Sequence, residues 1–546
     1  IDKKPAIVPV PSVLPRIIRL PDVSEANSRH CFVFLEDMLM FYAARFFVGY
    51  DLLEARAFRI TRDADLYIDE EDAQDLVVEV ERQLKKRQRG QAVRLEFEVG
   101  TSRFMRRFMT QEMNLEKEDM YQIDGPLDMT VFFGFCGIKG YNHLRYPEAH
   151  PHSPWSMLEL KRTPETNIFD MIREKDLLIH LPYESFDESV VNFLYSAAND
   201  KDVLAIKQTL YRVSSSSPVV QALEKAVQNG KQVTVLMEVK ARFDEANNIL
   251  MARRLEKAGA HVIYGLVGLK THSKCTLVIR REKDGIRRYV HVATGNYNAS
   301  TAKLYTDLGI LTCNDRFGID ASAFFNLLSG YSDPPIWDSF IVAPINLRQR
   351  CIELIDREIH FAKNGEDAHM IAKMNSLLDK GIIEKLYEAS QAGVKIELIV
   401  RGICVLIPGI PGVSDNITVR SIVGRFLEHS RIFWFRNGGR EELYISSADW
   451  MPRNLNDRVE LMVPIEDPEI KRRLKQMVDI ELSDNQKAHI MQADGTWLKT
   501  ISAENQLCAQ EYFQKIAEKR DAEDEMTLAQ KLEPYTPVLG HGDGSD

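Results

Sequence analysis

The feature that most constrains the fold is an internal repeat with a period of about 160 residues. A predicted helix ends at Gly230 in the first copy and at Gly393 in the second, and these glycines are 163 positions apart. An apolar strand follows each glycine, Val233–Val239 in one copy and Val394–Val400 in the other. Because a duplicated sequence folds twice into the same unit, we expect two similar domains that face each other.

From about residue 156 onward, apolar strands alternate with amphipathic helices, as in βαβ units. Ser217 as the N-cap and Pro218 at the first helical position predict the start of the helix Val219–Asn229. The corresponding helix of the second copy is expected over Gly381–Ala392. The pattern therefore predicts layered α/β domains.

Residues 1–155 have a different pattern. Ala57–Leu66 and Ala92–Val99 alternate apolar and polar residues, as half-buried strands do, and Glu71–Arg87 carries the apolar stripe of a helix. The end of the chain is rich in proline, glycine and aspartate, which predicts disorder. We expect an α/β protein with an α+β head domain (1–155), two tandem α/β/α domains (156–338 and 339–525) and a disordered tail (526–546).

Each copy also has a histidine two residues before a cation. His272-Ser273-Lys274 leads into the predicted strand Cys275–Ile279, and His429-Ser430-Arg431 leads into Ile432–Phe435, 157 positions later. Residues two apart in a strand point to the same face, so each histidine should lie beside its cation. Such a pair suits an anion held against a nucleophile or an acid–base group.

A polar turn follows each triplet. Asn296 and Asn298 come after the predicted strand Tyr289–Thr294, and Ser447 and Asp449 come after Leu443–Ser446. Two such motifs in equivalent places favour one active site where the repeats meet. The alternative is that the second motif is only a remnant of duplication.

The charge balance limits the partners of the chain. Acidic residues number 80 and basic residues 70, a net charge of −10, which argues against a general nucleic-acid binder. Anion binding must then be local, and a predicted basic patch between residues 269 and 288 has seven basic residues, namely Lys270, Lys274, Arg280, Arg281, Lys283, Arg287 and Arg288, against two acidic ones.

The cysteines and the apolar segments indicate the compartment. Seven cysteines are scattered without a CxxC pair, which predicts a reducing cytoplasm and no zinc ribbon or disulfide framework. The longest uncharged apolar stretch, near Gly402–Ser414, contains two prolines and falls short of the ~20 residues of a membrane helix. We therefore expect no integral membrane segment. The chain begins at Ile1 rather than Met, and we expect a fragment with sequence upstream.

The repeated His-x-Lys or His-x-Arg triplet with its polar turn resembles the phospholipase D superfamily. The first copy has Ile279 where that pattern has an aspartate, which argues against a phosphodiesterase function. Longer stretches resemble ATP-dependent polyphosphate kinase over most of residues 170–500: LLIHLPYESF, IKQTLYRV, EVKARF, GLKTHSK, HVATGNYN, VRGICVLI, FLEHSR and SSADWMPRN. Residues 1–155 resemble the head domain of that family, whose N-terminal helical domain is absent from this sequence.

The resemblance implies two phospholipase D-like domains and a reversible transfer of the ATP terminal phosphate to inorganic polyphosphate through a phosphohistidine. It implies Mg²⁺ as cofactor, ATP, ADP and polyphosphate as partners, and a homo-oligomer, dimer or tetramer, at full length. The enzyme would be cytoplasmic, with any membrane association peripheral. Two alternatives stay open: a phosphodiesterase in which the same histidine attacks a phosphodiester, and a polyanion-binding module whose site has decayed.

His272 is the expected nucleophile, because a neutral imidazole with a pKa near ~6.5 can attack phosphorus at cellular pH. Lys274 and Lys270 flank it and would offset the charge of the transferred group. The resemblance assigns Arg212 and Arg242 to the magnesium–phosphate site. Arginine is a poor ligand for a cation, so we expect both to hold phosphate oxygens while Mg²⁺ binds oxygens nearby.

The resemblance also assigns the nucleotide contacts. Tyr305 would stack on adenine, and Arg401 and His429 would contact the ATP phosphates. His429 is also a candidate to donate a proton to the leaving ADP. Secondary candidates for positioning phosphate, besides Lys270, are Asn296, Asn298, Arg431 and Asp449.

Overall fold

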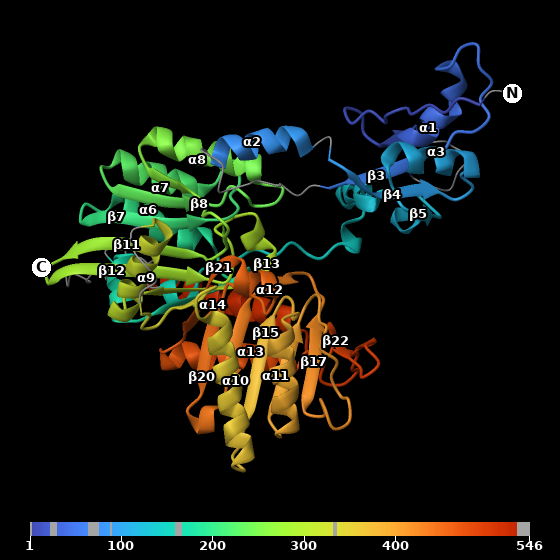
Figure 1. The fold of residues 1–546 in the computed structure, drawn as a ribbon. Coiled ribbons are helices and arrows are strands. Elements are labelled where there is room, and N and C mark those ends of the chain that lie inside the picture. Colours follow the sequence, from blue (N-terminus) through green and yellow to red (C-terminus); the bar gives the residue numbers. More distant parts are fainter. Residues whose placement is uncertain are drawn as a thin grey trace, which may run out of the picture. The chain divides into compact units, whose positions relative to one another are not determined.

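The computed structural model describes residues 3–21, 30–63, 76–87, 90–158, 166–330 and 336–531 (Figure 1). The chain divides into two units, one of residues 1–68 and 78–148 and the other of residues 69–77 and 149–546. Among the described residues, none of the helices combines the length and apolar character needed to cross a membrane.

The first unit contains two small sheets and short helices. In one sheet β1 (Ile17–Leu20) pairs antiparallel with β2 (Cys31–Phe34). In the other, β4 (Ala92–Glu98) pairs antiparallel with β3 (Phe58–Arg62) and parallel with β5 (Met120–Ile123). Its helices include α1 (Leu35–Phe41) and α3 (Arg103–Met113), and a small core forms around Leu95, Phe97 and Met109.

The predictions for this region hold in part. The strand predicted from Ala57 ends at Arg62 as β3, and the strand predicted from Ala92 is β4. The predicted helix is α2 (Leu76–Arg87), while residues 64–75 lie outside the described part of the chain. The mixed α and β content agrees with the expected α+β character.

The second unit holds the two copies of the repeat, called here the first lobe (residues 166–330) and the second lobe (residues 336–531). The first lobe has a sheet in the order β9-β8-β7-β11-β12-β13-β6. Its strands are β6 (Leu177–Leu181), β7 (Val203–Leu210), β8 (Gln232–Met237), β9 (His261–Tyr264), β11 (Cys275–Glu282), β12 (Gly285–Ala293) and β13 (Tyr305–Thr312). Its helices are α5 (Ile168–Glu174), α6 (Asn192–Asn199), α7 (Pro218–Gln228), α8 (Glu245–Ala258) and α9 (Asp315–Leu328).

The second lobe repeats this arrangement in the order β17-β16-β15-β19-β20-β21-β14, with two strands added beyond β17. Its strands are β14 (Ile341–Ala343), β15 (His369–Met374), β16 (Lys395–Val400), β17 (Ile417–Ile422), β19 (Arg431–Phe435), β20 (Glu442–Ser446), β21 (Arg458–Pro464), β22 (Ala488–Met491) and β23 (Trp497–Lys499). Its helices are α10 (Leu347–Lys363), α11 (Lys380–Gln391), α12 (Pro452–Asn456), α13 (Pro468–Leu482) and α14 (Ala509–Lys531).

The lobes exchange short strands. β10 (Lys270–Thr271) of the first lobe pairs parallel with the start of β21, and β18 (Leu427–Glu428) of the second lobe pairs parallel with the start of β13. The exchange is reciprocal, so each sheet gains a strand from the other lobe. Each exchanged strand immediately precedes one of the two motif histidines, which brings both motifs to the junction of the lobes.

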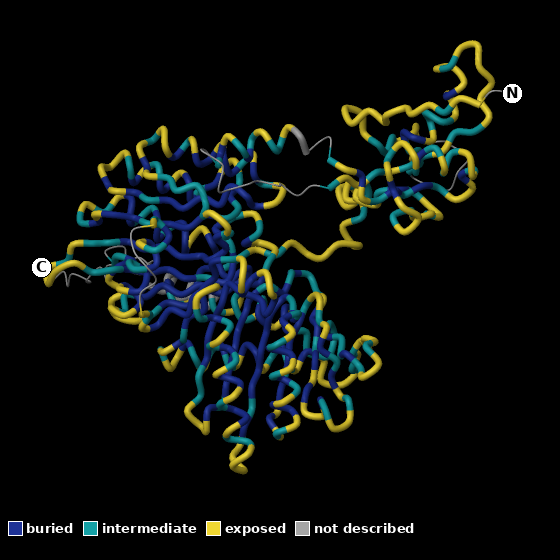
Figure 2. Tube along the Cα trace, viewed as in Figure 1, coloured by how far each residue is buried: buried dark blue, intermediate teal, exposed yellow. Residues whose placement is uncertain are grey.

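The lobes share a continuous hydrophobic core (Figure 2). Phe324 of α9 and Leu474 of α13 pack in it together with Leu277 of one sheet and Ile432 of the other. The outer face of the second sheet forms a separate core under α10 and α11. The repeat thus gives two α/β/α lobes that are joined along their inner faces.

Local predictions for the lobes are mostly confirmed. The Ser217 hydroxyl caps α7, and Pro218 is its first residue, as expected. The second copy of that helix is α11, which begins one residue before the predicted start and is capped by Asp379. The tail was expected to be disordered from residue 526, but α14 continues to Lys531, and residues 532–546 lie outside the described part.

Candidate active site

Both histidine triplets lie where the chain crosses from one sheet to the other. His272 and Ser273 stand between β10 and β11, and His429 and Ser430 stand between β18 and β19. The predicted continuous strand is interrupted there, but each cation still lies beside its histidine. The Lys274 ammonium donates to the backbone carbonyl of His272, and the Arg431 guanidinium donates to that of His429 and lies 3.2 Å from Nε2 of the same imidazole.

His272 is held by an acid of the other lobe. Its Nδ1 lies 2.9 Å from both carboxylate oxygens of Glu460, which is fully buried and also accepts a hydrogen bond of 2.5 Å from the Ser447 hydroxyl. When Glu460 is ionised it can only accept, so Nδ1 of His272 carries the proton and Nε2 has a free electron pair. Nε2 is therefore the ring atom with an electron pair available for nucleophilic attack.

The second histidine is held in the same way with the lobes exchanged. Nδ1 of His429 lies 2.8 Å from Oδ1 of Asp307, and Asp307 accepts a second hydrogen bond of 2.6 Å from the Thr294 hydroxyl. Each lobe thus contributes one histidine and the carboxylate that orients the histidine of the other lobe. Neither pair is complete within one lobe.

The site has titration properties set by burial. Desolvation lowers the pKa of His272 well below its ordinary value, and the charges of Lys274, Arg458, Arg431 and His429 lower it further, so the imidazole is neutral. Desolvation also lowers the pKa of Lys274 to about 7 and raises that of Glu460 to about 7. Burial likewise lowers the pKa of His429, against the opposing effect of Asp307.

Tyr211 and Arg458 complete the surroundings of His272. The ring of Tyr211 lies edge-on to the imidazole, with ring centroids 4.7 Å apart, and the Lys274 ammonium lies 5.5 Å from the centre of the Tyr211 ring. Arg458 lies 3.9 Å from Glu460 and pairs with Lys270 in the register of β10 and β21. Lys270, the cation predicted beside His272, is half-buried and lies next to Arg458. The second lobe thus adds a cation to the one that the first lobe contributes.

Tyr305 and Arg401, predicted to contact ATP, both lie near His429. The ring centroids of Tyr305 and His429 are 5.2 Å apart. Arg401 donates to the carbonyl of Glu428 at 2.9 Å and to the side-chain oxygen of Asn375 at 2.8 Å. Asn375 in turn donates to the carbonyl of His429, so these groups form one cluster.

Arg212 and Arg242 lie together in the first lobe. Arg212 pairs with Asp244 at 2.9 Å and donates to the backbone carbonyl of Arg242 at 3.2 Å. Arg212 directly follows Tyr211, whose ring lies against the imidazole of His272, so the loop borders His272. In the described part of the chain no group of three or more His, Cys, Asp or Glu side chains could hold a metal ion.

The secondary candidates have structural contacts. Asp449 accepts two hydrogen bonds of 3.1 Å from the buried Arg431 and also binds Asn375. The side chain of Asn298 accepts from the backbone of residues 300 and 301 and closes the turn. The side-chain oxygen of Asn296 is buried, and no protein hydrogen bond reaches it from the described residues.

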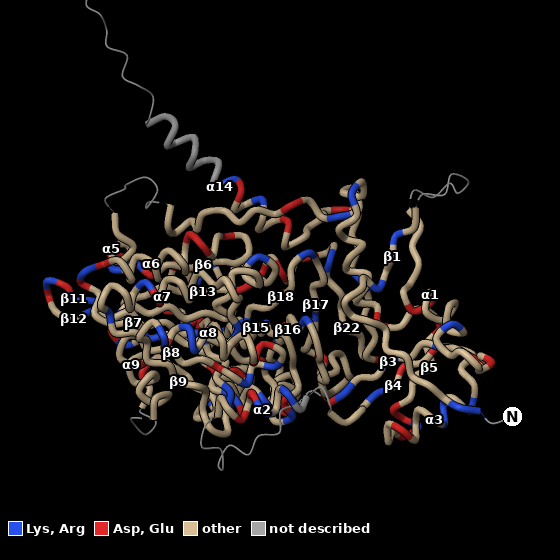
Figure 3. Tube along the Cα trace, turned by 90° about the horizontal axis from the view of Figure 1, so that it is seen from above, with Lys and Arg blue, Asp and Glu red and all other residues tan. Residues whose placement is uncertain are grey.

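The expected basic patch is divided, and in the β11–β12 hairpin basic residues lie among acidic ones (Figure 3). Lys270 and Lys274 lie at the site, but β11 carries the chain away from it by roughly 20 Å at ~3.3 Å per residue. At the far end of the β11–β12 hairpin, Arg280 pairs with Asp200 and Glu282, and Arg287 pairs with Asp284. The prediction of one focused patch is wrong, and the site instead takes its other cations from the second lobe.

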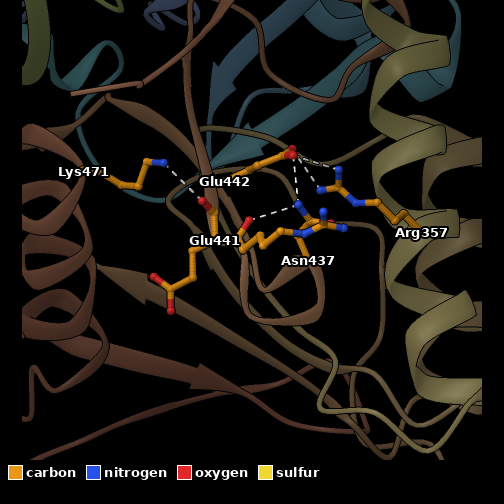
Figure 4. Close-up of a pocket in the computed structure, with 6 residues that line it drawn as sticks. Arg357, Asn437, Glu441, Glu442 and Lys471 are labelled. Atoms are coloured by element: carbon orange, nitrogen blue, oxygen red, sulfur yellow. Dashed lines mark hydrogen bonds and ion pairs between the residues drawn. The ribbon is translucent and has the colours of Figure 1, made fainter. Parts of the chain in front are cut away.

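A second polar pocket lies at the other end of β19 and β20 (Figure 4). Two of its acids are already in ion pairs: Glu442 binds Arg357 at 2.9 Å, and Glu441 binds Arg436 at 2.8 Å. Lys471 donates to the backbone carbonyl of Glu441 at 3.2 Å. The histidine junction remains the stronger candidate, because it combines buried imidazoles, carboxylates and cations.

Sequence reasoning missed Asp307, Glu460 and Arg458. Asp307 follows His272 by 35 positions and Glu460 follows His429 by 31, each on the strand after the polar turn. An acid at nearly the same distance in both copies was a signal that the repeat offered. Arg458 lies two residues before Glu460, and the equivalent residue of the first lobe, two before Asp307, is Tyr305. Because the repeat has no cation at both places, it gave no signal for Arg458.

Three family models match the chain. They are the polyphosphate kinase middle domain over residues 1–135, the C-terminal domain 1 over residues 167–334 and the C-terminal domain 2 over residues 340–510. Together with the two α/β lobes they confirm the predicted fold class, a head region followed by two similar α/β domains.

Curated relatives and a solved structure give the same result. The chain is 53% identical over 486 residues to a polyphosphate kinase of Halalkalibacterium halodurans, covering 88% of this chain and 68% of the relative. It is 49% identical to one of Bacillus anthracis, with 92% and 70% covered. The crystal structure of polyphosphate kinase from Porphyromonas gingivalis matches with a TM-score of 0.79 and 32% identity, covering 94% of this chain and 75% of that one.

Proposed function

Because the chain belongs to the polyphosphate kinase family, we propose that it transfers the terminal phosphate of ATP reversibly to inorganic polyphosphate through a phosphohistidine at His272. The observation that carries the proposal is the contact between Nδ1 of His272 and the carboxylate of Glu460. It leaves Nε2 free to attack while burial keeps the imidazole neutral.

In the first step, Nε2 of His272 forms a bond to the γ-phosphorus as the bond from that phosphorus to the bridging oxygen breaks, and ADP departs. The phosphorylated imidazole keeps its proton on Nδ1 and becomes cationic, and Glu460 stabilises that charge. In the second step, a terminal oxygen of polyphosphate attacks the phosphorus, and the electron pair of the N–P bond returns to Nε2. Lys274 and Arg458 offset the charge of the phosphoryl group in both steps.

His429 acts on the nucleotide side. Burial lowers its pKa in the empty site, and the negative phosphates of ATP raise it again when they bind. The imidazolium formed in this way is held by Asp307 and gives its proton to the departing ADP. Arg401 binds the phosphates from the same side, and the Tyr305 ring stacks on the adenine.

Magnesium enters with the nucleotide in this proposal. The described residues include no group of three or more His, Cys, Asp or Glu side chains that could hold a metal ion, so Mg²⁺ would be held by the phosphate oxygens of ATP and would offset their charge. Arg212 and Arg242 hold the remaining phosphate oxygens from the loop beside Tyr211. Isothermal titration with ATP in the presence and absence of Mg²⁺ tests this assignment. Arg212→Ala should weaken the binding of Mg·ATP, and titration with Mg²⁺ without ATP should show no binding to either protein.

We also propose a homo-oligomer that works in the cytoplasm. The seven cysteines are scattered along the sequence without a CxxC pair, which supports a reducing compartment. Sedimentation of the full-length protein distinguishes a dimer or tetramer from a monomer, and a monomer over the working concentration range would refute this part of the proposal.

One experiment tests the central step. Incubation with γ-labelled ATP should give a protein label that is labile to acid and stable to alkali, as a phosphohistidine is. The label should be lost in His272→Ala and retained in Cys275→Ala, because burial raises the pKa of the Cys275 thiol and makes it a poor nucleophile. Absence of label on the folded, full-length wild-type protein would favour a phosphodiesterase or a binding module.

A further inference from the structure

The first turn of α14 is bonded to the segment that leads into His429. The side-chain oxygen of Gln510 accepts from the backbone N–H of Phe426 at 3.0 Å, and its side-chain nitrogen donates to the carbonyl of the same residue at 2.9 Å. That nitrogen also donates to the carboxylate of Glu428 at 2.6 Å. Gln510 is buried, and a side chain at Gly424 would collide with it, since an added Cβ would lie 2.4 Å from its oxygen.

Glu428, next to His429, receives hydrogen bonds from three further elements. Its carboxylate accepts from Lys373 of β15 at 2.7 Å and from the Thr306 hydroxyl of β13 at 2.9 Å. The same Thr306 oxygen accepts from the backbone N–H of His429 at 3.1 Å. Arg401 donates to the backbone carbonyl of Glu428. The position of His429 is thus set through Glu428.

The beginning of α14 is itself anchored. The backbone N–H of Ala509 donates to the buried Asp484 at 2.7 Å, and the ring of Phe513 packs against His180 and Tyr183 of the first lobe at 5.2 and 5.5 Å. Gln510 therefore belongs to a helical turn that contacts both lobes. Its hydrogen bonds to Phe426 and Glu428 hold residues 424–428 against this turn.

We propose that Gln510 is a positioning residue, which holds His429 in line with Asp307 by fixing the backbone of Phe426 and the carboxylate of Glu428. Gln510 itself does not reach the reacting atoms. The inference rests on the proposed function, in which His429 serves the departure of ADP.

Gln510→Glu keeps the size and shape of the side chain. When the new carboxyl is ionised, it can no longer donate a hydrogen bond to the carboxylate of Glu428. Charged groups around the new carboxyl are Glu428, Lys373, Glu481 and Asp484, with Tyr183 and His180 on the facing lobe, so repulsion by the acids keeps it protonated up to a raised pH. We expect labelling of His272 by γ-labelled ATP to slow about tenfold at alkaline pH and to recover toward the wild-type rate as the pH falls, because a protonated carboxyl both donates and accepts. Gln510→Met, of similar size, should slow labelling at every pH without recovery.

Gln514→Glu, one turn later on α14, is the matched control. Gln514 donates at 3.2 Å to the carbonyl of His150 at the surface, so this change should leave labelling unaltered. Wild-type labelling rates in both Gln510 variants would overturn the inference, and so would a loss in Gln510→Glu that does not recover as the pH falls. If Gln510→Glu does not fold, Gln510→Met decides: slower labelling with an unchanged thermal unfolding temperature supports the inference, and a loss that follows a lowered unfolding temperature overturns it. Absence of label on the wild-type protein would instead refute the proposed function.

Discussion

Nδ1 of His272 lies 2.9 Å from both carboxylate oxygens of Glu460, so the imidazole of the first lobe is oriented by an acid of the second. Glu460→Gln keeps the size of the side chain and removes the negative charge that stabilises the phosphorylated imidazole. We expect the rate of His272 labelling to fall about 100-fold, or roughly 2.7 kcal/mol in activation free energy. Rapid-quench labelling with γ-labelled ATP measures it.

Ser447→Ala is the control for that change. It removes one hydrogen bond to Glu460 but leaves the carboxylate charged, so labelling should fall less than tenfold. Equal losses in the two variants would mean that packing around Glu460, rather than its charge, limits the reaction.

The pH dependence of kcat/KM for ATP should be a narrow bell centred near pH 7. As the pH falls through about 7, Glu460 takes up a proton and loses its charge; as the pH rises through about 7, Lys274 loses its proton. Glu460→Gln should remove the acid limb. Lys274→Arg should remove the alkaline limb, because a guanidinium stays charged.

Initial labelling rates at low ATP concentration, measured between about pH 5.5 and 9, give the pH profile of the free enzyme. If both limbs of the profile are unchanged in both variants, the assignment of the limbs to Glu460 and Lys274 is wrong.

The repeat allowed much of the second unit to be predicted, because periodicity and capping are local. Ser217 and Pro218 marked the start of α7 correctly, and the two triplets correctly indicated a meeting point of the lobes. The exchanged strands β10 and β18 are two residues long, and so short a strand leaves no periodic pattern to detect.

The surroundings of the histidines depended on contacts between distant residues. Arg280 and Arg287 are close to His272 in sequence, yet an extended strand carries them away and acids neutralise them. Arg458 is distant in sequence and comes close only because β10 pairs with β21. A count of basic residues close to His272 in sequence therefore predicted the wrong cations for the site.

ATP binding should be accompanied by proton uptake. Burial lowers the pKa of His429 and brings that of Lys274 to about 7, and the phosphates of ATP raise both. Calorimetry near pH 7.5 in buffers of different ionisation enthalpy should show uptake of about one proton in His272→Ala, which binds without turnover. Adding His429→Gln should reduce the uptake, and adding His360→Gln, on the surface, should not. The same uptake in all three proteins would exclude His429 as the group that is protonated.

Gly295 is explained by its neighbour Asp307. A Cβ at position 295 would lie 2.1 Å from Oδ2 of Asp307, so Gly295→Ala must displace the carboxylate that orients His429. We expect a loss of about 1–3 kcal/mol in the free energy of unfolding, as for other overpacked sites. Labelling should fall at least tenfold, since the acid–base group is misplaced. Gly134→Ala, where an added Cβ meets no atom within 4 Å, is the control for both measurements.

The double variant Gly295→Ala/Asp307→Ala separates the two effects. Removing the Asp307 carboxylate relieves the collision, so the double variant should be more stable to urea than the sum of the single changes predicts, a coupling typical of residues in contact. Its labelling rate should stay as low as that of Asp307→Ala, because His429 has no orienting acid in either protein. Strictly additive stabilities would show that the backbone at position 295 moves away from Asp307, and the proposed reason for the glycine would then be wrong.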